Sequence, residues 1–427
     1  MFTCTHCDGQ FPKWQGRCTE CGKWGTLTEE SESQNPLHKS TKGGAKPAPT
    51  LSLSDASISH VKHIPTQIEE FDRVLCGGIV PGSVTLLAGE PGIGKSTIVA
   101  QLAHLFSTQK PAYYVSGEES EGQVAMRLKR LNVDPKNILF SNAIDIDAIL
   151  SSAKQHNPSL LIIDSIQTMI ASEIDNLPGT PTAVRAATAQ LIGFAKQSNT
   201  PVLLIGQMTK DGSVAGPKTL EHLVDTVLTL EGDKQSAFRL LHCGKNRFGS
   251  TDEVGIFEMT QSGLQGVDNP SARFLEDRTQ NPGSVVTCVM EGTRPILVEV
   301  QALAEKSLFA NPIRRTSGYD ASRLQMLLAI ISKRAGVAVS ALDVYVNVVG
   351  GIKIKEPAAD LAICAAIISS VKDTSYPKDT IAFGEMGLSG EIRTVPFIEK
   401  RIKEAQRLGF TNILSPKTKK HLREIIG

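Results

Sequence analysis

The sequence predicts an α/β protein made of a small cysteine-rich module, a P-loop domain with a mostly parallel sheet, and a second, α+β domain. Three observations support this fold class. From about residue 66, apolar strands alternate with helices, which is typical of a parallel sheet covered on both faces. After residue 206, strands follow one another directly, as they do where a sheet ends in antiparallel hairpins. Near residue 280, a new set of paired strands and helices begins.

These changes divide the chain into four predicted segments. Residues 1–28 form a compact unit rich in Cys, Gly and Trp, and residues 29–60 are polar, rich in Gly and Pro, and typical of a flexible linker. Residues 61–270 hold the alternating pattern and its hairpins, and residues 271–427 hold the second domain. A chain of 427 residues exceeds what one hydrophobic core usually serves, so several domains are expected.

Charge and hydropathy exclude several classes of protein. Lys plus Arg number 45 and Asp plus Glu number 44, a net charge of +1, so any nucleic-acid surface must be local. No apolar run reaches the roughly 18 residues that span a bilayer, and the N-terminus lacks the apolar region of a signal peptide. We therefore expect a cytoplasmic protein with no membrane partner.

The strongest motif is GEPGIGKST, which follows an apolar strand and opens a helix. Gly89, four residues, and then Gly94, Lys95 and Ser96 match the spacing of a P-loop. In a P-loop, backbone N–H groups converge on phosphate oxygens, the lysine adds positive charge, and the hydroxyl reaches Mg²⁺. The alternative is a glycine turn without a ligand, which the flanking strand and helix disfavour.

Carboxylates end two of the predicted strands near this motif. Asp164 follows the strand LLIID, where a carboxylate usually holds Mg²⁺ through water. Glu118 and Glu119 follow the strand AYYVSG, and one of them is the predicted base for the attacking water. We favour Glu118, while the alternative is that both are solvated loop charges.

Four cysteines near the N-terminus have the spacing of a metal site. Two CxxC pairs separated by ten residues, Cys4 with Cys7 and Cys18 with Cys21, suit tetrahedral Zn²⁺. A redox dithiol is the alternative, and the presence of two pairs argues against it. Because the module is under thirty residues, the metal should supply its folding energy. The scattered cysteines are expected to be buried thiols: Cys76, Cys243, Cys288 and Cys364.

Two cations flank an asparagine in LLHCGKNRFGS, just after a predicted strand. Lys245 and Arg247 are expected on a turn, where they would meet the need of a P-loop site for a cation from a neighbouring subunit. Two alternatives remain open: contacts to a nucleic-acid backbone, or a solvated turn.

These motifs, together with CTHCDGQFPKWQGRCTECGKWGTL and NVVGGIKIKEPAADLA, resemble the bacterial RadA (Sms) DNA repair proteins in content and order. The resemblance implies a zinc finger, a RecA-like ATPase and a Lon-protease-like domain. It implies a hexameric ring that uses ATP to drive branch migration on single-stranded and branched DNA, beside a recombinase of the RecA type. It also implies zinc on the four N-terminal cysteines, Lys245 and Arg247 at the subunit boundary, and ATP or ADP with Mg²⁺ on the P-loop residues Gly89, Glu90, Pro91, Gly92, Ile93, Gly94, Lys95, Ser96 and Thr97 and on Asp164.

The C-terminal domain departs from active Lon proteases. Where they carry Gly-Pro-Ser-Ala-Gly, this chain has Glu356 to Asp360, with Ala358 in the nucleophile's place. Alanine cannot form an acyl-enzyme, so neither Lys400 nor Lys403 would act as a base, and proteolysis is disfavoured. We expect a scaffold that closes the ring, with DNA contacts from Lys353 and Lys355.

Two further functions stay in competition with a DNA translocase. One is a passive mediator that binds single strands and uses ATP as an assembly switch, and the other is an ATP-dependent protease. Residues 206–222, rich in Gly and Lys, are the candidate for a DNA-contacting loop.

Overall fold

The computed structural model describes residues 2–4, 10–11, 13–29, 62–172, 177–207, 220–232 and 237–426. The chain divides into two compact units, Met1–Val61 and Lys62–Gly427, which are described separately. No helix within the described ranges is both long and apolar enough to cross a membrane. The predicted linker falls almost wholly on residues 30–61, outside the described part of the chain.

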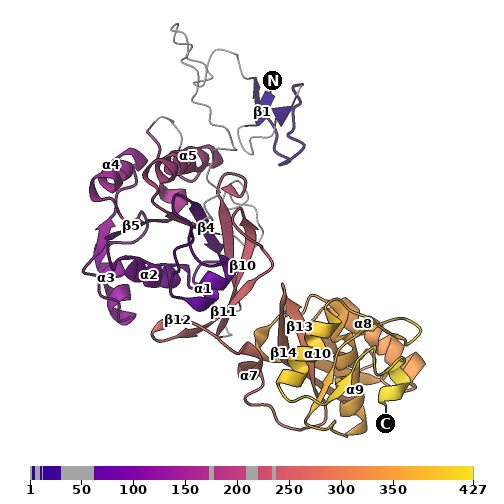
Figure 1. The fold of residues 1–427 in the computed structure, drawn as a ribbon. Helices are drawn as coiled ribbons and strands as arrows, with labels where there is room; N and C mark the ends of the chain where they lie inside the picture. Colours follow the sequence, from indigo (N-terminus) through magenta and orange to yellow (C-terminus); the bar gives the residue numbers. More distant parts are fainter. Residues whose placement is uncertain are drawn as a thin grey trace, which may run out of the picture. The chain divides into compact units, whose positions relative to one another are not determined.

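The first unit is a small three-stranded antiparallel sheet in the order β2-β1-β3 (Figure 1). Its strands are β1 (Phe2–Cys4), β2 (Gln10–Phe11) and β3 (Leu27–Glu29). Cys4, Cys18 and Leu27 are its buried residues among those described. An apolar core this small cannot hold a fold alone, which agrees with a module that depends on metal.

The second unit begins with a nine-stranded sheet in the order β12-β11-β10-β9-β4-β8-β7-β5-β6. Its six parallel strands are β4 (Val84–Gly89), β5 (Ala112–Ser116), β6 (Ile138–Ser141), β7 (Leu160–Asp164), β8 (Val202–Gln207) and β9 (Thr226–Glu231). Three antiparallel strands extend one edge: β10 (Phe238–Asn246), β11 (Val254–Thr260) and β12 (Gly263–Gly266). The predicted change from parallel strands to hairpins is confirmed.

Helices cover both faces of this sheet, as Figure 1 shows. Alternate residues of β4 decide the packing: Leu87 contacts the face covered by three helices, and Leu86 the face covered by two. The first group is α1 (Glu69–Val74), α2 (Lys95–Phe106) and α3 (Glu121–Arg130). The second is α4 (Ile146–His156) and α5 (Pro181–Ser198). Because both faces are buried, the central strands are almost continuously apolar.

The second unit continues with a six-stranded sheet in the order β15-β16-β14-β13-β17-β20. The strands are β13 (Ser284–Glu291), β14 (Arg294–Lys306), β15 (Arg314–Ser317), β16 (Leu342–Val348), β17 (Thr380–Ala382) and β20 (Asn412–Leu414). A short hairpin, β18 (Glu385–Met386) and β19 (Ile392–Arg393), lies beside it. The helices are α7 (Pro270–Phe274), α8 (Ala321–Ile330), α9 (Asp360–Lys372) and α10 (Ile398–Arg407).

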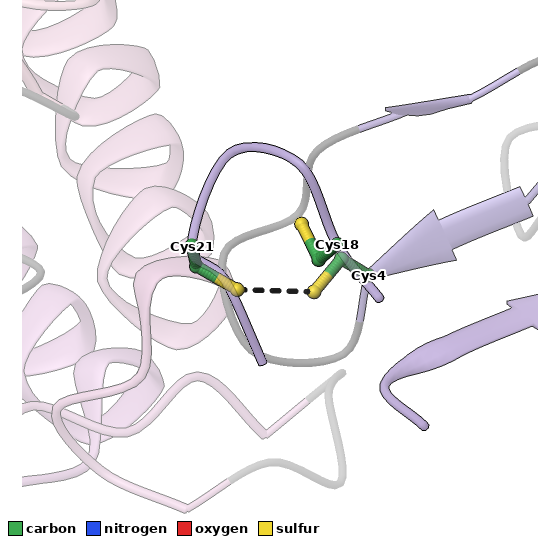
Figure 2. A group of neighbouring side chains, drawn as sticks. All are labelled: Cys4, Cys18 and Cys21. Atoms are coloured by element: carbon green, nitrogen blue, oxygen red, sulfur yellow. Dashed lines mark hydrogen bonds between the residues drawn. The ribbon is translucent and has the colours of Figure 1, made fainter. Parts of the chain in front are cut away.

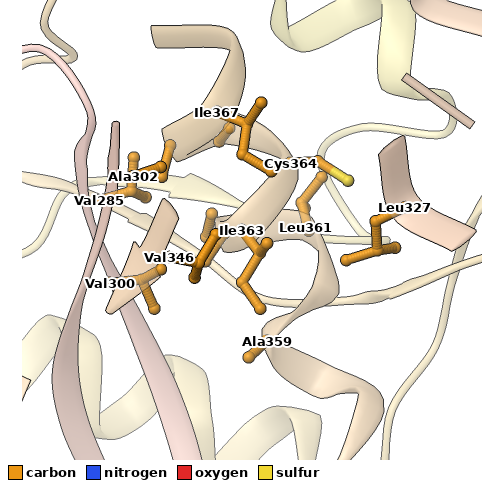
Figure 3. Packing of buried hydrophobic residues seen from close by; sticks show 14 of the residues in the cluster. Val285, Val300, Ala302, Leu327, Val346, Ala359, Leu361, Ile363, Cys364 and Ile367 are labelled. Atoms are coloured by element: carbon orange, nitrogen blue, oxygen red, sulfur yellow. The ribbon is translucent and has the colours of Figure 1, made fainter. Parts of the chain in front are cut away.

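The core of this α+β part lies between the sheet and helices α8 and α9. Figure 3 shows Val346 of the sheet next to Ile363 of α9, and Leu327 of α8 next to Leu361 of the same helix. α9 is apolar on nearly all sides because the domain encloses it. Ala358, in the short turn that precedes α9, is also fully buried.

One expectation about the cysteines is wrong. Cys243, Cys288 and Cys364 are buried, but Cys76 is exposed. Cys76 follows the end of α1 with a positive φ of 57°, in a turn at the surface. Its thiol lies near the carbonyl of Ser250 at 3.5 Å instead of entering the core.

Candidate functional site

The P-loop joins β4 to α2, so it lies at the carboxyl edge of the parallel sheet. β4 ends at Gly89, and α2 begins at Lys95. Gly94 has φ 117°, and a Cβ there would lie 2.7 Å from the Met259 side chain. A Cβ on Gly89 would lie 2.6 Å from the Leu230 carbonyl oxygen. Gly89 needs glycine because the backbone of β9 leaves no room for a side chain, and Gly94 needs it because of its positive φ.

Lys95 lies within this loop and is only 7% exposed. Its Nζ donates to the carbonyl oxygens of Gly89 (2.8 Å) and Glu90 (2.9 Å). Burial lowers the pKa of Lys95, while the charges of Asp164 and Glu118 oppose that shift. The cation is thus held by neutral acceptors, and among the described residues it has no direct ion pair that a phosphate would have to displace.

Asp164 ends β7 and is 6% exposed. The Tyr114 hydroxyl donates to its Oδ2 at 2.7 Å. Burial raises the pKa of Asp164, and hydrogen bonds from Tyr114 and Ser96 partly offset this. Sequence reasoning did not identify Tyr114, although its place on the neighbouring strand β5 follows from the sheet order. The Asp164 carboxylate and the Ser96 hydroxyl would offer only oxygen ligands, which fits Mg²⁺.

The two glutamates after β5 have different partners. Glu118 accepts hydrogen bonds from Ser165 Oγ (2.5 Å) and from Gln207 Nε2 (2.9 and 3.0 Å). Glu119 is instead ion-paired with Arg127 of α3. Glu118 keeps an exposed carboxylate bound to neutral donors, whereas the charge of Glu119 is neutralised. The preference for Glu118 as base stays a prediction.

Gln207 and Ser165 are further site residues that sequence reasoning missed. Ser165 directly follows Asp164, and Gln207 is the last residue of β8. Both lie at carboxyl ends of strands adjacent to each other in the sheet, β7 and β8. The available signal was therefore a polar residue at the end of an apolar strand, the same signal that identified Asp164.

Lys245 does not lie on a turn, which corrects the expectation. It belongs to β10, at a bulge between Cys243 and Lys245, and Arg247 is the first cation beyond the strand. The bulge changes the local register, and sequence alone gives little sign of it.

Both cations bind the segment before β9. Lys245 Nζ donates to the carbonyl oxygens of Glu221 (2.7 Å), Val224 (2.8 Å) and His222 (3.3 Å). Arg247 donates to Asp225 Oδ1 at 3.1 Å, and its side chain is 50% exposed. Partial burial, followed by the charge of Arg247, lowers the pKa of Lys245. The candidate DNA loop itself falls mostly on residues 208–219, outside the described ranges.

Three of the four predicted zinc ligands come together in the first unit, as Figure 2 shows. The sulfur atoms of Cys4, Cys18 and Cys21 all lie within 4.8 Å of one another, and Cys4 Sγ is 3.8 Å from Cys21 Sγ. Two thiolates at about 2.3 Å from a tetrahedral zinc would be about 3.8 Å apart, so the residues fit that metal. Cys7 lies outside the described residues.

The C-terminal domain carries a buried ion pair beside the place of the missing nucleophile. Ala358 is fully buried, and Arg401, not Lys400 or Lys403, is the basic residue of α10 that enters the core. Arg401 donates to Glu356 Oε1 (2.8 Å) and Oε2 (2.5 Å). A guanidinium that is paired with a carboxylate cannot serve as a general base. The expected Lys353 and Lys355 are exposed.

Comparison with known families agrees with each of these parts. A family described as a rubredoxin metal binding domain matches residues 2–29, and an AAA domain family matches residues 47–213. A family described as subunit ChlI of Mg-chelatase matches residues 321–419. A P-loop, a strand-end aspartate and a nearby glutamate at the edge of a mostly parallel sheet define a RecA-like ATPase domain.

Curated relatives match nearly the whole length of the chain. The DNA repair protein RadA of Pseudomonas aeruginosa is 46% identical over 419 residues, covering 97% of this chain and 92% of its own. That of Escherichia coli is 43% identical over 422 residues, covering 97% and 92%. The chain therefore belongs to the RadA family of DNA repair proteins. A crystal structure of the RadB recombinase matches at 22% identity with a TM-score of 0.39, covering 48% of this chain and 99% of that one, a likeness too low to add to this.

Proposed function

We propose that this protein is an ATP-driven DNA helicase that acts as a hexameric ring, promotes branch migration and processes recombination intermediates in the cytoplasm. Its partners would be single-stranded and branched DNA and a recombinase of the RecA type. One observation carries the proposal. Residues of the proposed site contact the segments on both sides of residues 208–219, which make up most of the candidate DNA-contacting loop. Glu118 binds Gln207 at one flank, and Lys245 and Arg247 bind Glu221 to Asp225 at the other.

Hydrolysis would use the groups at the carboxyl edge of the sheet. Backbone N–H groups from Gly89 to Thr97 and the charge of Lys95 would bind the phosphates of ATP or ADP. Ser96 and Asp164 would hold Mg²⁺, which offsets charge on the phosphates. Glu118 would accept the proton of the attacking water, and its hydrogen bonds from Ser165 and Gln207 orient the carboxylate for that step.

Lys245 and Arg247 would face the nucleotide of a neighbouring subunit. Arg247 is half exposed, so it can exchange its contact with Asp225 for a phosphate. Such an exchange would also alter how the pair holds the segment from Glu221 to Asp225. Hydrolysis at one boundary would thus be coupled to a DNA-facing loop.

The decisive experiment is unwinding of a forked DNA duplex with ATP or a non-hydrolysable analogue. A helicase unwinds only with ATP, whereas Lys95→Ala protein does not unwind at all. A passive mediator, the alternative, would bind single strands under both conditions and unwind under neither.

Mixing variants tests whether the cations act between subunits. Arg247→Ala should retain nucleotide affinity but lose turnover, because a cation from the neighbour stabilises the transition state more than the ground state. Mixed rings of Arg247→Ala and Lys95→Ala should regain part of the hydrolysis. Absence of rescue, with mixing of subunits verified, would place Arg247 in its own subunit's site.

A further inference from the structure

A buried arginine outside the P-loop contacts that loop directly. Arg239 lies on β10 and is 6% exposed. Its Nε donates to the carbonyl oxygen of Ile93 at 3.1 Å, and its Nη1 donates to the carbonyl oxygen of Phe238 at 2.8 Å. Burying a guanidinium is tolerated only where its donors find acceptors, and the Ile93 carbonyl oxygen is one of those acceptors.

The contacted carbonyl belongs to the peptide that joins Ile93 to Gly94. Ile93 immediately precedes Gly94, the N-cap residue of that helix. In a planar trans peptide, the C=O of one residue and the N–H of the next point in opposite directions. A donor that fixes the Ile93 carbonyl therefore also fixes the direction of the Gly94 N–H, away from Arg239.

The loop needs such an anchor because glycine leaves its backbone soft. Gly92 and Gly94, on either side of Ile93, have φ values of 80° and 117°. Glycine adopts many backbone conformations at little cost, so the peptide between Ile93 and Gly94 is not held by local sterics. Anchoring it before a ligand arrives removes an ordering cost from binding.

We infer that Arg239 is a positioning residue for nucleotide binding, which orients the Gly94 N–H toward the phosphates through its hydrogen bond to Ile93. This rests on the proposed nucleotide site and adds a residue from a strand far from the motif in sequence. Arg239 acts through the loop and not on the phosphates. It should therefore affect affinity more than the rate of the chemical step.

The test compares two replacements of Arg239 in the full-length protein, with a fluorescent ADP derivative as probe. Arg239→Met keeps the apolar stem but removes the donors, and the dissociation constant should rise about tenfold or more, the usual effect of losing a charged hydrogen bond. KM for ATP should rise in parallel while kcat changes less than about threefold. Arg239→Lys, which keeps a charged donor but not the guanidinium geometry, should have an affinity between those of Arg239→Met and the wild type.

Gln101→Leu is the matched control for a merely structural effect. Gln101 joins α2 to β12 by hydrogen bonds with Leu264 at 3.1 Å, but it does not touch the loop backbone. Its loss should leave ADP affinity within about twofold of the wild type. An equal loss of affinity in Gln101→Leu and Arg239→Met would overturn the inference, as would unchanged affinity in folded Arg239→Met.

Arg239→Lys keeps the inference testable if Arg239→Met does not fold. It should bind ADP measurably more weakly than wild type at unchanged thermal stability, and equal affinity would refute the positioning role.

Two outcomes keep this inference separate from the proposed function. If wild-type protein binds no ADP, the nucleotide site itself fails. If wild type binds and folded Arg239→Met binds equally well, only the role of Arg239 fails.

Discussion

Lys95 and Glu118 of the ATPase domain have different kinds of partner from Arg401 and Asp360 of the C-terminal domain. In the ATPase domain, Lys95 is held by backbone carbonyls, and Glu118 by a hydroxyl and an amide. In the C-terminal domain, Arg401 is fully buried and paired with Glu356. Asp360, also fully buried, is paired in the same way with Arg323.

The difference bears on which of these charges can change partners. Charges held by neutral groups can change partners when a ligand arrives, because no opposite charge has to be removed. The two members of a buried ion pair do not readily change partners, because separating them leaves an uncompensated charge in a low dielectric. The loss of a nucleophile at Ala358 is therefore accompanied by charge pairing that belongs to the fold.

The largest expected effect separates two adjacent residues of the ATPase domain. Glu118→Gln should lower kcat by about two to four orders of magnitude and leave nucleotide binding intact, because the amide cannot accept the proton. Glu119→Gln removes the ion pair with Arg127 and should lower kcat less than about tenfold. Steady-state ATPase assays decide this, and a larger loss in Glu119→Gln would reverse the assignment.

The ion pair between Arg401 and Glu356 should contribute to the free energy of unfolding of the C-terminal domain. Arg401→Met leaves the Glu356 carboxylate without its cation and should cost about 3–5 kcal/mol in the unfolding of that domain. Denaturant unfolding followed by circular dichroism measures it.

Arg407→Met on the same helix is the matched control. Arg407 pairs with Glu404 at 2.8 Å but is 55% exposed, so its loss should cost less than about 1 kcal/mol. Adding Glu356→Gln to Arg401→Met should recover part of the stability. Similar costs for both arginines would mean that the buried pair is not a special feature of this domain.

A smaller effect concerns Glu291, at the end of β13. Burial raises the pKa of Glu291 from its usual value of 4.5 to about 7; the charge of Lys355 opposes this shift, and the charges of Glu356 and Glu231 add to it. The folded state therefore binds the proton more tightly than the unfolded state, and stability falls as pH rises from about 4.5 to 7. Above pH 7 the full cost remains, about 3 kcal/mol for this shift of the pKa.

Glu291→Gln tests this pH dependence. The variant should be more stable than wild type at pH 8 and nearly equal at pH 4.5. Thermal unfolding at both pH values measures the difference. Equal stabilities at pH 8 would show that Glu291 ionises in the fold without cost.

The smallest effect concerns the zinc module, which contains both tryptophans of the chain. Metal removal should unfold the module, because the cysteine thiolates lose the metal ion that they bind in common. Trp14 is already 62% exposed and Trp24 75% exposed, so their emission should shift only slightly to the red. Zinc release with a chelating dye is the sensitive readout, and a large red shift would show that the tryptophans are more buried than the structure has them.

The sequence by itself determined the local features of this protein. Strand and helix order, the P-loop and the paired CxxC motifs depend on spacing along the chain, and each can be identified from neighbouring residues alone. Asp164 was also predictable, because a carboxylate that ends an apolar strand must lie at the edge of a parallel sheet.

Only the tertiary structure decided which charged side chains have neutral partners and which are held in ion pairs. Glu118 and Glu119 are adjacent in sequence, yet one binds Gln207 from another strand and the other binds Arg127. Arg401 pairs with Glu356, 45 residues away, while Lys400 and Lys403 remain outside the core. The physical reason is that the state of an ionisable group depends on its burial and partners, and long-range packing brings those partners together.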